Sequence, residues 1–231
     1  MIFRQLFDRV SCTYTYLLAD PLVRQAVLID PVLSHVDRDI KLLDELGLDL
    51  RYILETHVHA DHITGAAKIR SRIPSAAIVY GSANKVQGAD LLINDKEFLA
   101  VGSIIITARH TPGHTSGCCS YITDILNKTY AFTGDTILIR GCGRTDFQEG
   151  SSKTLYESVK NIIFALPDAA VICPGHDYNG FGISTVGEEK NHNPRFNRGL
   201  QHFESVMDNL KLAYPAKIKI AVLANQICGD V

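Results

Sequence analysis

Residues 56–62 have the sequence Thr-His-Val-His-Ala-Asp-His, which places three imidazoles and one carboxylate within seven positions. The apolar run Tyr52-Ile53-Leu54 comes directly before them and indicates a buried strand that ends at the histidines. Imidazole and carboxylate together are typical ligands of a divalent transition metal. A solvated surface loop would account for one isolated histidine, but it does not account for this spacing. The stretch therefore predicts a metal site at the end of a strand.

Three further segments show the same order of strand, turn and potential ligand. His114 lies on a Pro-Gly turn after the β-branched run 104–107. Asp135 follows a glycine at the end of an apolar run, and His176 follows the buried-type run 170–173. Short apolar or β-branched runs bounded by turn residues are typical of strands, and strand ends deliver side chains to one edge of a sheet. We therefore expect these residues to meet the first group of histidines at one metal site.

The composition fits one globular unit. A chain of 231 residues with 46% hydrophobic residues can bury a full core, so we expect a single domain over residues 1–231. The net charge of −2 offers no general field for nucleic acid or an anionic membrane. No stretch approaches the roughly 18–20 apolar residues of a membrane-spanning helix. The first residues lack an apolar leader, so we expect a location in the bacterial cytoplasm, or in the mitochondrial matrix for a processed eukaryotic protein.

Helices and short strands alternate along the chain. Apolar residues recur at helical spacing in four segments, which predicts helices from Ser34 (N-cap) to Gly47 (C-cap), over 61–72, from Ser151 to Pro167 and over 197–210. Alternating or continuous apolar runs predict strands at 11–19, 25–30, 50–55 and 218–223.

The six cysteines show no C-x-x-C spacing, so we expect free thiols rather than a disulfide framework. Cys12 and Cys173 lie in apolar runs, which predicts that they are core residues. Cys142 lies between glycines and Cys228 lies near the C-terminus, so we expect these two to be more exposed. The sequence assigns no role to Cys142 or Cys228.

The motifs THVHADH, TPGHT, FTGDT and PGHDY together resemble the pattern of the metallo-β-lactamase superfamily. The resemblance implies an α+β fold, an αββα sandwich of two mixed β-sheets flanked by helices, with its metal site at one edge. Within this superfamily, the segments IRGCGRTDFQ, NPRF and LANQICG are similar to those of the persulfide dioxygenases. The similarity extends from about Cys12 to Cys228, which is almost the whole chain.

The superfamily uses up to seven metal ligands, and this chain holds all of them: His57, His59, Asp61, His62, His114, Asp135 and His176. A dinuclear hydrolase divides them between two metals that Asp135 bridges. A mononuclear iron dioxygenase uses two histidines and one carboxylate, which leaves positions for substrate and oxygen. The resemblance assigns one Fe(2+) per chain to the catalytic residues His57, His114 and Asp135. According to the resemblance, the remaining residues either orient the metal ligands or bind a second metal; they are His59, Asp61, His62 and His176. The ligand types alone leave both chemistries open.

The resemblance implies an enzyme that oxidises glutathione persulfide with O2 to sulfite and glutathione. The alternative is a glyoxalase II-type dinuclear zinc hydrolase of glutathione thioesters. Such hydrolases carry a longer helical C-terminal part, whereas about fifty-five residues follow His176 here. A non-enzymatic metal-binding or redox-sensing protein is a third hypothesis, but an open three-ligand site is typical of catalysis.

Glutathione carries two carboxylates, so we expect cations at the entrance to the site. The candidates for substrate binding are Arg144, Tyr178 and Arg195, while Arg140 and Asp146 would instead pair to hold the loop. Family resemblance also predicts a homodimer. No sulfurtransferase (rhodanese) domain is fused to the chain, so any such partner would be separate.

Overall fold

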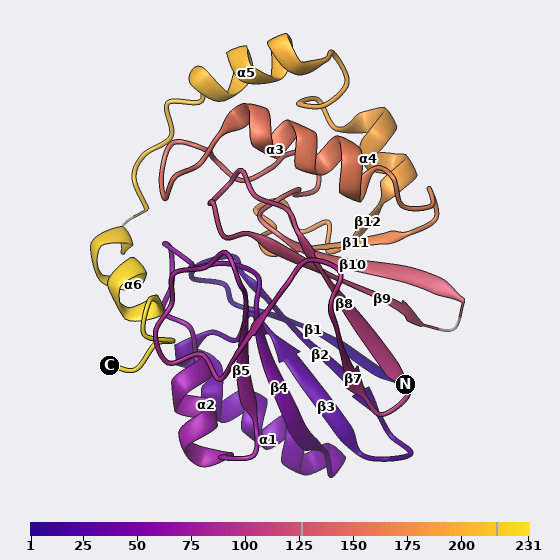
Figure 1. Ribbon diagram of the computed structural model, residues 1–231, viewed down its shortest axis with the longest axis vertical. Coiled ribbons are helices and arrows are strands. Elements are labelled where there is room, and N and C mark those ends of the chain that lie inside the picture. The colour runs from indigo at the N-terminus through magenta and orange to yellow at the C-terminus, as the bar shows by residue number, and fades with distance from the viewer. Residues whose placement is uncertain (126, 216) are drawn as a thin grey trace.

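Two six-stranded β-sheets pack face to face, with helices on the outer face of each (Figure 1). The computed structural model describes residues 1–125, 127–215 and 217–231. The first sheet has the order β1-β2-β3-β4-β5-β6 and contains β1 (Ile2–Phe7), β2 (Tyr14–Asp20), β3 (Gln25–Ile29), β4 (Asp49–Glu55), β5 (Ala77–Gly81) and β6 (Leu91–Ile93). The pairs β1–β2 and β2–β3 are antiparallel, and the pairs from β3 to β6 are parallel.

The second sheet has the order β12-β11-β10-β9-β8-β7. It contains β7 (Phe98–Val101), β8 (Ile104–His110), β9 (Cys119–Ile125), β10 (Lys128–Gly134), β11 (Val171–Pro174) and β12 (Ser184–Thr185). Only the pair β10–β11 is parallel. Both sheets are therefore mixed, and the predicted αββα sandwich is confirmed.

The helices cover the sheets in two groups (Figure 1). The 3-10 helix η1 (Leu33–His35), α1 (Val36–Leu46) and α2 (Ala66–Arg72) lie on the first sheet. The second group comprises α3 (Ser152–Ser158), the π-helical turn η2 (Val159–Ile163), α4 (Val186–His192) and α5 (Leu200–Asp208). Helix α6 (Ile218–Asn225) packs near the end of the sandwich that carries the 56–62 loop. None of the helices in the described residues is long and apolar enough to cross a membrane.

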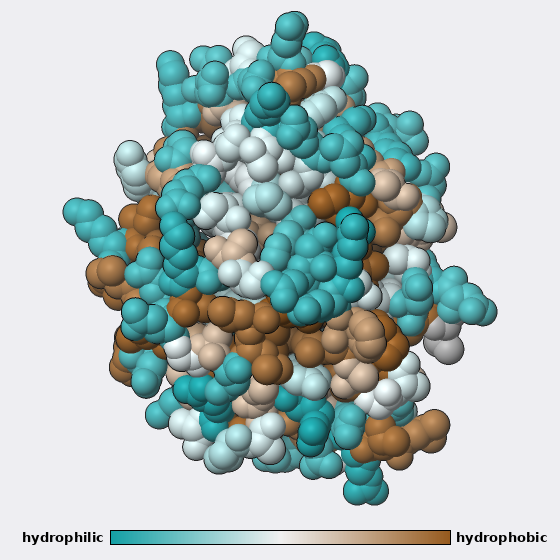
Figure 2. Space-filling model, in the orientation of Figure 1, coloured by the Kyte–Doolittle hydropathy of each residue, from teal (hydrophilic) through white to brown (hydrophobic). Residues whose placement is uncertain are grey.

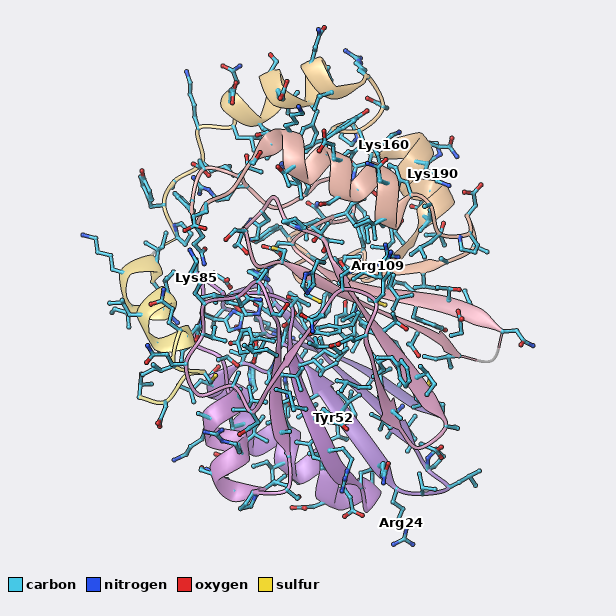
Figure 3. The ribbon with its side chains drawn as sticks, viewed as in Figure 1. Arg24, Tyr52, Lys85, Arg109, Lys160 and Lys190 are labelled. Carbon is cyan, nitrogen blue, oxygen red and sulfur yellow. The ribbon has the colours of Figure 1, made fainter. Side chains whose placement is uncertain are left out.

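Strand β2 lies at the centre of the core, and all seven of its residues are buried. Because successive side chains of a strand point to opposite faces, Tyr16 and Leu18 pack between the sheets, while Leu17 and Ala19 pack under the helices. Side chains fill the space between the sheets, where Tyr52 is also directed (Figure 3). Full burial of one such large apolar side chain contributes about 1.5–3 kcal/mol, so this layer holds the strand ends rigidly.

The strand ends at the metal motif differ from the sequence prediction. The predicted helix 61–72 begins at Ala66, because residues 61–65 turn around the edge of the sheet and direct Asp61 and His62 to the site. The predicted strand 11–19 begins at Tyr14, since Cys12 has a positive φ of 61° and Thr13 bridges to His176. Both departures bring polar side chains to the candidate site.

Other boundaries also depart from the prediction. Ser34 is not the N-cap of α1, because a 3-10 turn precedes the helix and His35 takes that position, whereas Gly47 is confirmed as the left-handed C-cap. The predicted helix 197–210 begins at Leu200, after Gly199 at a φ of 84°. The predicted strand 218–223 is helix α6. Its short apolar run also fits helical spacing, since Ala221, Ala224 and Asn225 are buried together.

The cysteines are free, as predicted, but their burial differs from the prediction for three of them. Cys142 and Cys228 are buried, because the first packs against Met207 and the second under α2. Cys12 is partly exposed in the turn before β2, whereas Cys173 is confirmed as a core residue.

The surface in Figure 2 is mostly polar, with an apolar band across the middle of this face. The edge strands β6 and β7 carry the exposed apolar residues Leu91, Leu92 and Phe98. Lys160 of η2 and Lys190 of α4 carry their charged side chains on the helices that cover the second sheet (Figure 3).

Candidate metal centre

Four loops meet at one edge of the sandwich, after strands β4, β8, β10 and β11. They bring together His57, His114 and Asp135, one ligand atom of each lying within 4.8 Å of the other two. Two of these side chains are fully buried or nearly so, and His114 is partly buried. Two imidazoles and one carboxylate at this spacing suit a transition metal with open coordination positions.

A chain of hydrogen bonds orients His57. The Thr56 hydroxyl donates to Asp30 Oδ2 at 2.8 Å, so its oxygen accepts a bond from His57 Nδ1 at 2.9 Å. Asp30 also accepts a bond from the Thr56 amide at 2.7 Å. This arrangement leaves the lone pair of His57 on Nε2, where it can bind a metal. Burial, with the neighbouring His59 and His114, lowers the pKa of His57 well below its usual value and keeps the ring neutral.

The loop after β10 orients His114 in the same way. His114 Nδ1 donates to the carbonyl of Arg144 at 2.6 Å, which leaves Nε2 as the free nitrogen, 3.5 Å from Asp135 Oδ2. A Cβ atom at Gly143 would lie 2.7 Å from the ring of His114 and 2.6 Å from the carbonyl of Asp135. The second glycine of the Gly-Cys-Gly segment is therefore required by the close approach of these two ligands.

Asp135 is fixed by a histidine on its other side. His176 Nδ1 donates to Asp135 Oδ1 at 2.6 Å, and His176 Nε2 lies 3.0 Å from Asp61 Oδ2. Burial opposes ionisation, but His176, His114 and His57 outweigh it and hold the pKa of Asp135 below its usual range. Burial likewise opposes protonation of His176, and Asp135 and Asp61 overcome it, so the pKa of His176 is raised well above its usual value. Asp135 is therefore a buried carboxylate that the protonated ring of His176 holds in place.

A second group of potential ligands lies beside the first. His59, Asp61 and His62 also have one ligand atom each within 4.8 Å of the others. Within the described part of the chain, His59 Nδ1 and His62 Nε2 are buried and have no hydrogen-bond partner. Buried polar atoms without partners are costly, and a metal ion would satisfy them. The residues present therefore fit a metal, and the site has donors for one ion or two.

Two buried carboxylates behind His59 were missed by the sequence analysis. His59 Nε2 lies 3.2 Å from Asp30 Oδ1 and 3.4 Å from Glu55 Oε2. Burial opposes protonation of His59, but Asp30 and Glu55 outweigh it and raise the pKa of His59 to about 10. A metal at Nδ1 would replace the proton on that nitrogen, while Nε2–H stays directed at the two carboxylates. Burial raises the pKa of Glu55 to about 7. Asp30 directly follows strand β3, which pairs with β4, so its place at the same strand edge as His57 could have indicated a role at the site.

Thr13 is a further residue that the sequence analysis missed. Its hydroxyl lies 3.1 Å from His176 Nε2 and 3.3 Å from His62 Nδ1, and it bonds to Ser11 Oγ at 2.7 Å. This hydroxyl links the first strand pair to the metal site. Nothing in the local sequence separates it from an ordinary strand threonine.

A cleft of about 690 Å³ opens above the cluster, and His114, Asp135 and His176 form part of its wall. All three predicted substrate-binding residues also line it, namely Arg144, Tyr178 and Arg195. Tyr178 is 67% exposed, and its ring stacks on that of His176 at 5.9 Å between centroids. Arg195 Nη1 donates to the carbonyl of Cys142 at 2.8 Å.

The predicted pairing of Arg140 with Asp146 in the loop of the cleft is wrong, because each residue pairs with another partner. Arg140 pairs with Glu188 and Glu189, and the backbone amide of Arg140 donates to Glu189 at 2.9 Å. Asp146 instead accepts two bonds of 2.7 Å from Arg144. The reason is that Arg140 has a left-handed backbone, with φ at 60°, and its side chain reaches α4.

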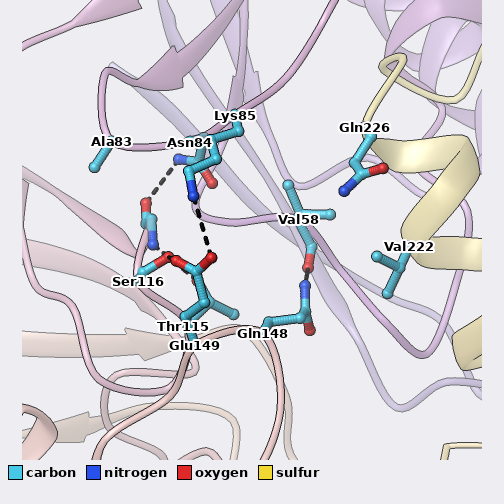
Figure 4. Close-up of a pocket in the computed structure, with 11 residues that line it drawn as sticks. Val58, Ala83, Asn84, Lys85, Thr115, Ser116, Gln148, Glu149, Val222 and Gln226 are labelled. Atoms are coloured by element: carbon cyan, nitrogen blue, oxygen red, sulfur yellow. Dashed lines mark hydrogen bonds and ion pairs between the residues drawn. The ribbon is translucent and has the colours of Figure 1, made fainter.

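Gln148 lines the cleft and also a smaller cavity of about 130 Å³, which Figure 4 shows. Gln148 Nε2 donates to the carbonyl of Val58 at 2.7 Å and so anchors the residue between His57 and His59. Lys85 and Glu149 form an ion pair of 3.1 Å at its rim. Gln148 was not among the predicted site residues, although it lies in the segment 139–148 that supported the family resemblance.

The comparisons with known proteins agree with this geometry. The sequence matches the model of the metallo-beta-lactamase superfamily over residues 13–176. The Mus musculus protein named persulfide dioxygenase ETHE1, mitochondrial, is 49% identical over 229 residues, which cover 99% of this chain and 89% of that protein. The crystal structure of ETHE1 from Myxococcus xanthus has 46% identity and a TM-score of 0.94, covering 99% of this chain and 100% of that one.

A hydrolase relative matches less of the chain. The probable hydroxyacylglutathione hydrolase glo2 of Schizosaccharomyces pombe is 37% identical over 169 residues, which cover 71% of this chain and 64% of that protein. The ETHE1 proteins match almost the whole chain, and the superfamily model covers the segment that contains all seven potential ligands. The chain therefore belongs to the metallo-β-lactamase superfamily and, within it, to the ETHE1-like persulfide dioxygenase group.

Proposed function

We propose that this protein is an iron-dependent persulfide dioxygenase that oxidises glutathione persulfide to sulfite. The balanced reaction is GSS⁻ + O2 + H2O → GSH + SO3²⁻ + H⁺. The single observation that supports this most is the match to ETHE1 persulfide dioxygenases over 99% of the chain. The triad of His57, His114 and Asp135 is consistent with it, because two histidines and one carboxylate are typical of non-haem Fe(II) oxygenases.

In this proposal His57, His114 and Asp135 would hold Fe(2+), one ion per chain. When bound, the metal would supply redox chemistry and open positions for the persulfide sulfur and O2. His176 holds Asp135 through Oδ1, which leaves Oδ2 facing His114 and available as a ligand. The hydrogen bonds of the Thr56 hydroxyl and of the Arg144 carbonyl fix both histidine rings before a metal arrives.

The cleft has the features of a site for a bulky thiol derivative. Its volume of about 690 Å³ accommodates a tripeptide, and the wall above the metal ligands is formed by the segment 138–144. Tyr178 offers an open aromatic face, and we propose that Arg144 and Arg195 face the peptide. A persulfide is largely ionised near neutral pH, so the site needs no general base to generate the sulfur nucleophile. The task of the protein is to position the sulfur and O2 together.

A second group of potential ligands, His59, Asp61 and His62, supports an alternative function, that of a dinuclear hydrolase. With two metals bound, the same cleft could hydrolyse a glutathione thioester, as the name of the S. pombe relative implies for that protein. This S. pombe relative matches 71% of the chain, whereas the mouse ETHE1 protein matches 99%, so we rank this alternative second.

We further propose that the protein is a homodimer and that a sulfurtransferase is its partner. The mouse relative is named as mitochondrial. For this chain we propose the bacterial cytoplasm, or the mitochondrial matrix in a eukaryote. Sedimentation velocity tests the dimer, because a monomer at micromolar concentration contradicts it.

The decisive experiment combines metal analysis with two activity assays on protein purified without oxygen. We expect one equivalent of iron, O2 consumption that requires glutathione persulfide, and release of sulfite. We expect little hydrolysis of S-lactoylglutathione under anaerobic conditions. Two equivalents of zinc with rapid thioester hydrolysis would establish the alternative.

A further inference from the structure

Four arginine and lysine side chains line the cleft within the described residues: Arg140, Arg144, Arg195 and Lys217. Their surroundings differ. Arg140 is neutralised by Glu188 and Glu189, and the second of these carboxylates is fully buried. A guanidinium held by two carboxylates has little charge left for a ligand, so Arg140 has a structural task.

Arg144 is also largely engaged. Its guanidinium donates to both oxygens of Asp146, to the carbonyl of Ala213 at 2.7 Å and to that of Leu212 at 3.2 Å. It also stacks on Phe147, 4.0 Å from the ring centroid. Of its five N–H groups, four therefore have acceptors and one remains for a substrate. Two of these contacts hold the segment 212–213 against the loop, and Lys217 comes four residues after Ala213.

The other two cations have no carboxylate partner within residues 1–125, 127–215 and 217–231. Arg195 Nη1 bonds to the carbonyl of Cys142 at 2.8 Å and contacts its sulfur at 3.2 Å. The ammonium group of Lys217 has neither an ion pair nor a hydrogen bond to the described residues, and the side chain is exposed at the mouth of the cleft. Lys217 therefore has the least committed charge on the wall of the cleft.

We propose that Lys217 binds one of the two carboxylates of the tripeptide substrate, and that it selects peptide persulfides over uncharged ones. This inference rests on the proposed function. Glutathione has two carboxylates, and the cleft has two cations without an acidic partner, Arg195 and Lys217. An ammonium on a flexible four-carbon stem suits the outer carboxylate, because it can follow a mobile group at the mouth. Arg195, which is fixed through Cys142, suits the inner one.

The contact is solvent-exposed, so its contribution is modest. Exposed ion pairs of this kind change affinity by about three- to fivefold, and salt weakens them. The effect should appear in KM, because the carboxylate is remote from the reacting sulfur. The KM of the wild-type enzyme should also rise with ionic strength more steeply than that of a Lys217 variant.

The test compares Lys217→Ala with Lys219→Ala, since Lys219 is also exposed but does not line the cleft. Each iron-loaded variant is assayed with glutathione persulfide and with the persulfide of glutathione diethyl ester, whose carboxylates are neutral. We expect Lys217→Ala to raise KM for the free acid about three- to fivefold and to leave KM for the ester unchanged. Lys219→Ala should match the wild type, and Lys217→Arg should restore most of the affinity. Calorimetry with plain glutathione gives a readout without turnover and should show the same order.

Three outcomes would overturn the proposal. The first is a Lys217→Ala variant with unchanged KM. The second is an equal shift in Lys219→Ala, which would indicate a general charge effect. The third is an equal shift for the ester, which would indicate a contact other than with a carboxylate. Failure of the proposed function is a separate result, because the wild-type enzyme would then show no persulfide-dependent uptake of O2. The calorimetric comparison would still decide the role of Lys217.

Discussion

The metal cluster and the mouth of the cleft are neighbours, but different kinds of contact hold them. At the cluster, buried side chains are fixed by hydrogen bonds from residues at adjacent strand ends, as in the contact between His57 and Thr56. At the mouth, partly exposed cations are held by segments far away in the sequence, as in the bonds from Arg144 to residues 212–213. The buried strand ends of the two sheets hold the cluster in place. The mouth is formed by loops and by the C-terminal segment, and a few contacts, such as those of Arg144, hold these segments together.

This difference predicts where substitutions act. Changes at the cluster should affect metal content and rate, since they remove a ligand or release one. Changes at the mouth should affect KM and leave metal content unchanged. The following variants test this division in order of decreasing effect.

The largest effect is expected for Asp135→Ala. A site of two neutral imidazoles lacks the negative charge that holds Fe(2+), and His176 would lose the carboxylate that neutralises it. We expect loss of bound iron and of persulfide-dependent O2 uptake, measured by metal analysis and an oxygen electrode. Full iron content in this variant would show that Asp135 is not a ligand.

His176→Ala should have the next largest effect. His176 orients Asp135 through a bond of 2.6 Å, and loss of such an orienting group typically lowers the rate roughly 10- to 100-fold. We expect most of the iron to remain, and His176→Gln to be less damaging because an amide can still donate to Asp135. Complete loss of metal from His176→Ala would make this histidine a ligand and favour the dinuclear arrangement.

The contrast also explains how far the sequence could predict the site. His57, His114 and Asp135 each follow a strand, and strand ends share one edge, so local patterns predicted that these side chains meet there. Arg140 illustrates the opposite case, because its partners Glu188 and Glu189 lie almost fifty residues away. No local pattern predicts such a pair. The pairing of Arg140 with Asp146 was therefore wrong, although the family resemblance placed the loop correctly.

The prediction of the fold from local sequence patterns was limited in the same way. The strands 25–30 and 50–55 were predicted because their apolar runs are continuous and buried. Residues 218–223 were predicted as a strand and form α6, since a short apolar run fits both periods and tertiary packing decides between them. The buried face of α6 places Asn225 where its side chain donates to the carbonyls of His59 and His62. This contact crosses more than 160 residues of sequence, so only the folded structure reveals it.

Arg144→Ala tests the mouth of the cleft. The variant loses one N–H available to the substrate and releases the segment 212–213 that leads to Lys217. A charge-assisted contact contributes about 1.5–3 kcal/mol, so we expect KM for glutathione persulfide to rise at least about tenfold, with iron content unchanged.

Asp146→Ala is the matched control for Arg144. If Arg144 only braces the loop, removal of its carboxylate partner should raise KM as much as Arg144→Ala does. If Arg144 contacts the substrate, Asp146→Ala frees the guanidinium and KM should stay constant or fall. Steady-state kinetics with both variants therefore distinguish the two roles, and equal increases in KM would assign Arg144 to bracing.

The smallest effect is expected at Tyr178, which lies between the two regions. Its ring stacks on His176 with an interplanar angle of 3°, yet the residue is 67% exposed and its hydroxyl has no hydrogen bond to the described residues. Tyr178→Phe keeps the stacked ring and should leave both kcat and KM unchanged. Tyr178→Ala removes a contact worth about 0.5–1.5 kcal/mol, so we expect a change of about two- to tenfold. An increase in KM alone would place Tyr178 with the mouth, whereas a fall in kcat would place it with the cluster, acting through His176. A large loss in Tyr178→Phe would contradict both assignments, because it would show that the hydroxyl itself binds the substrate.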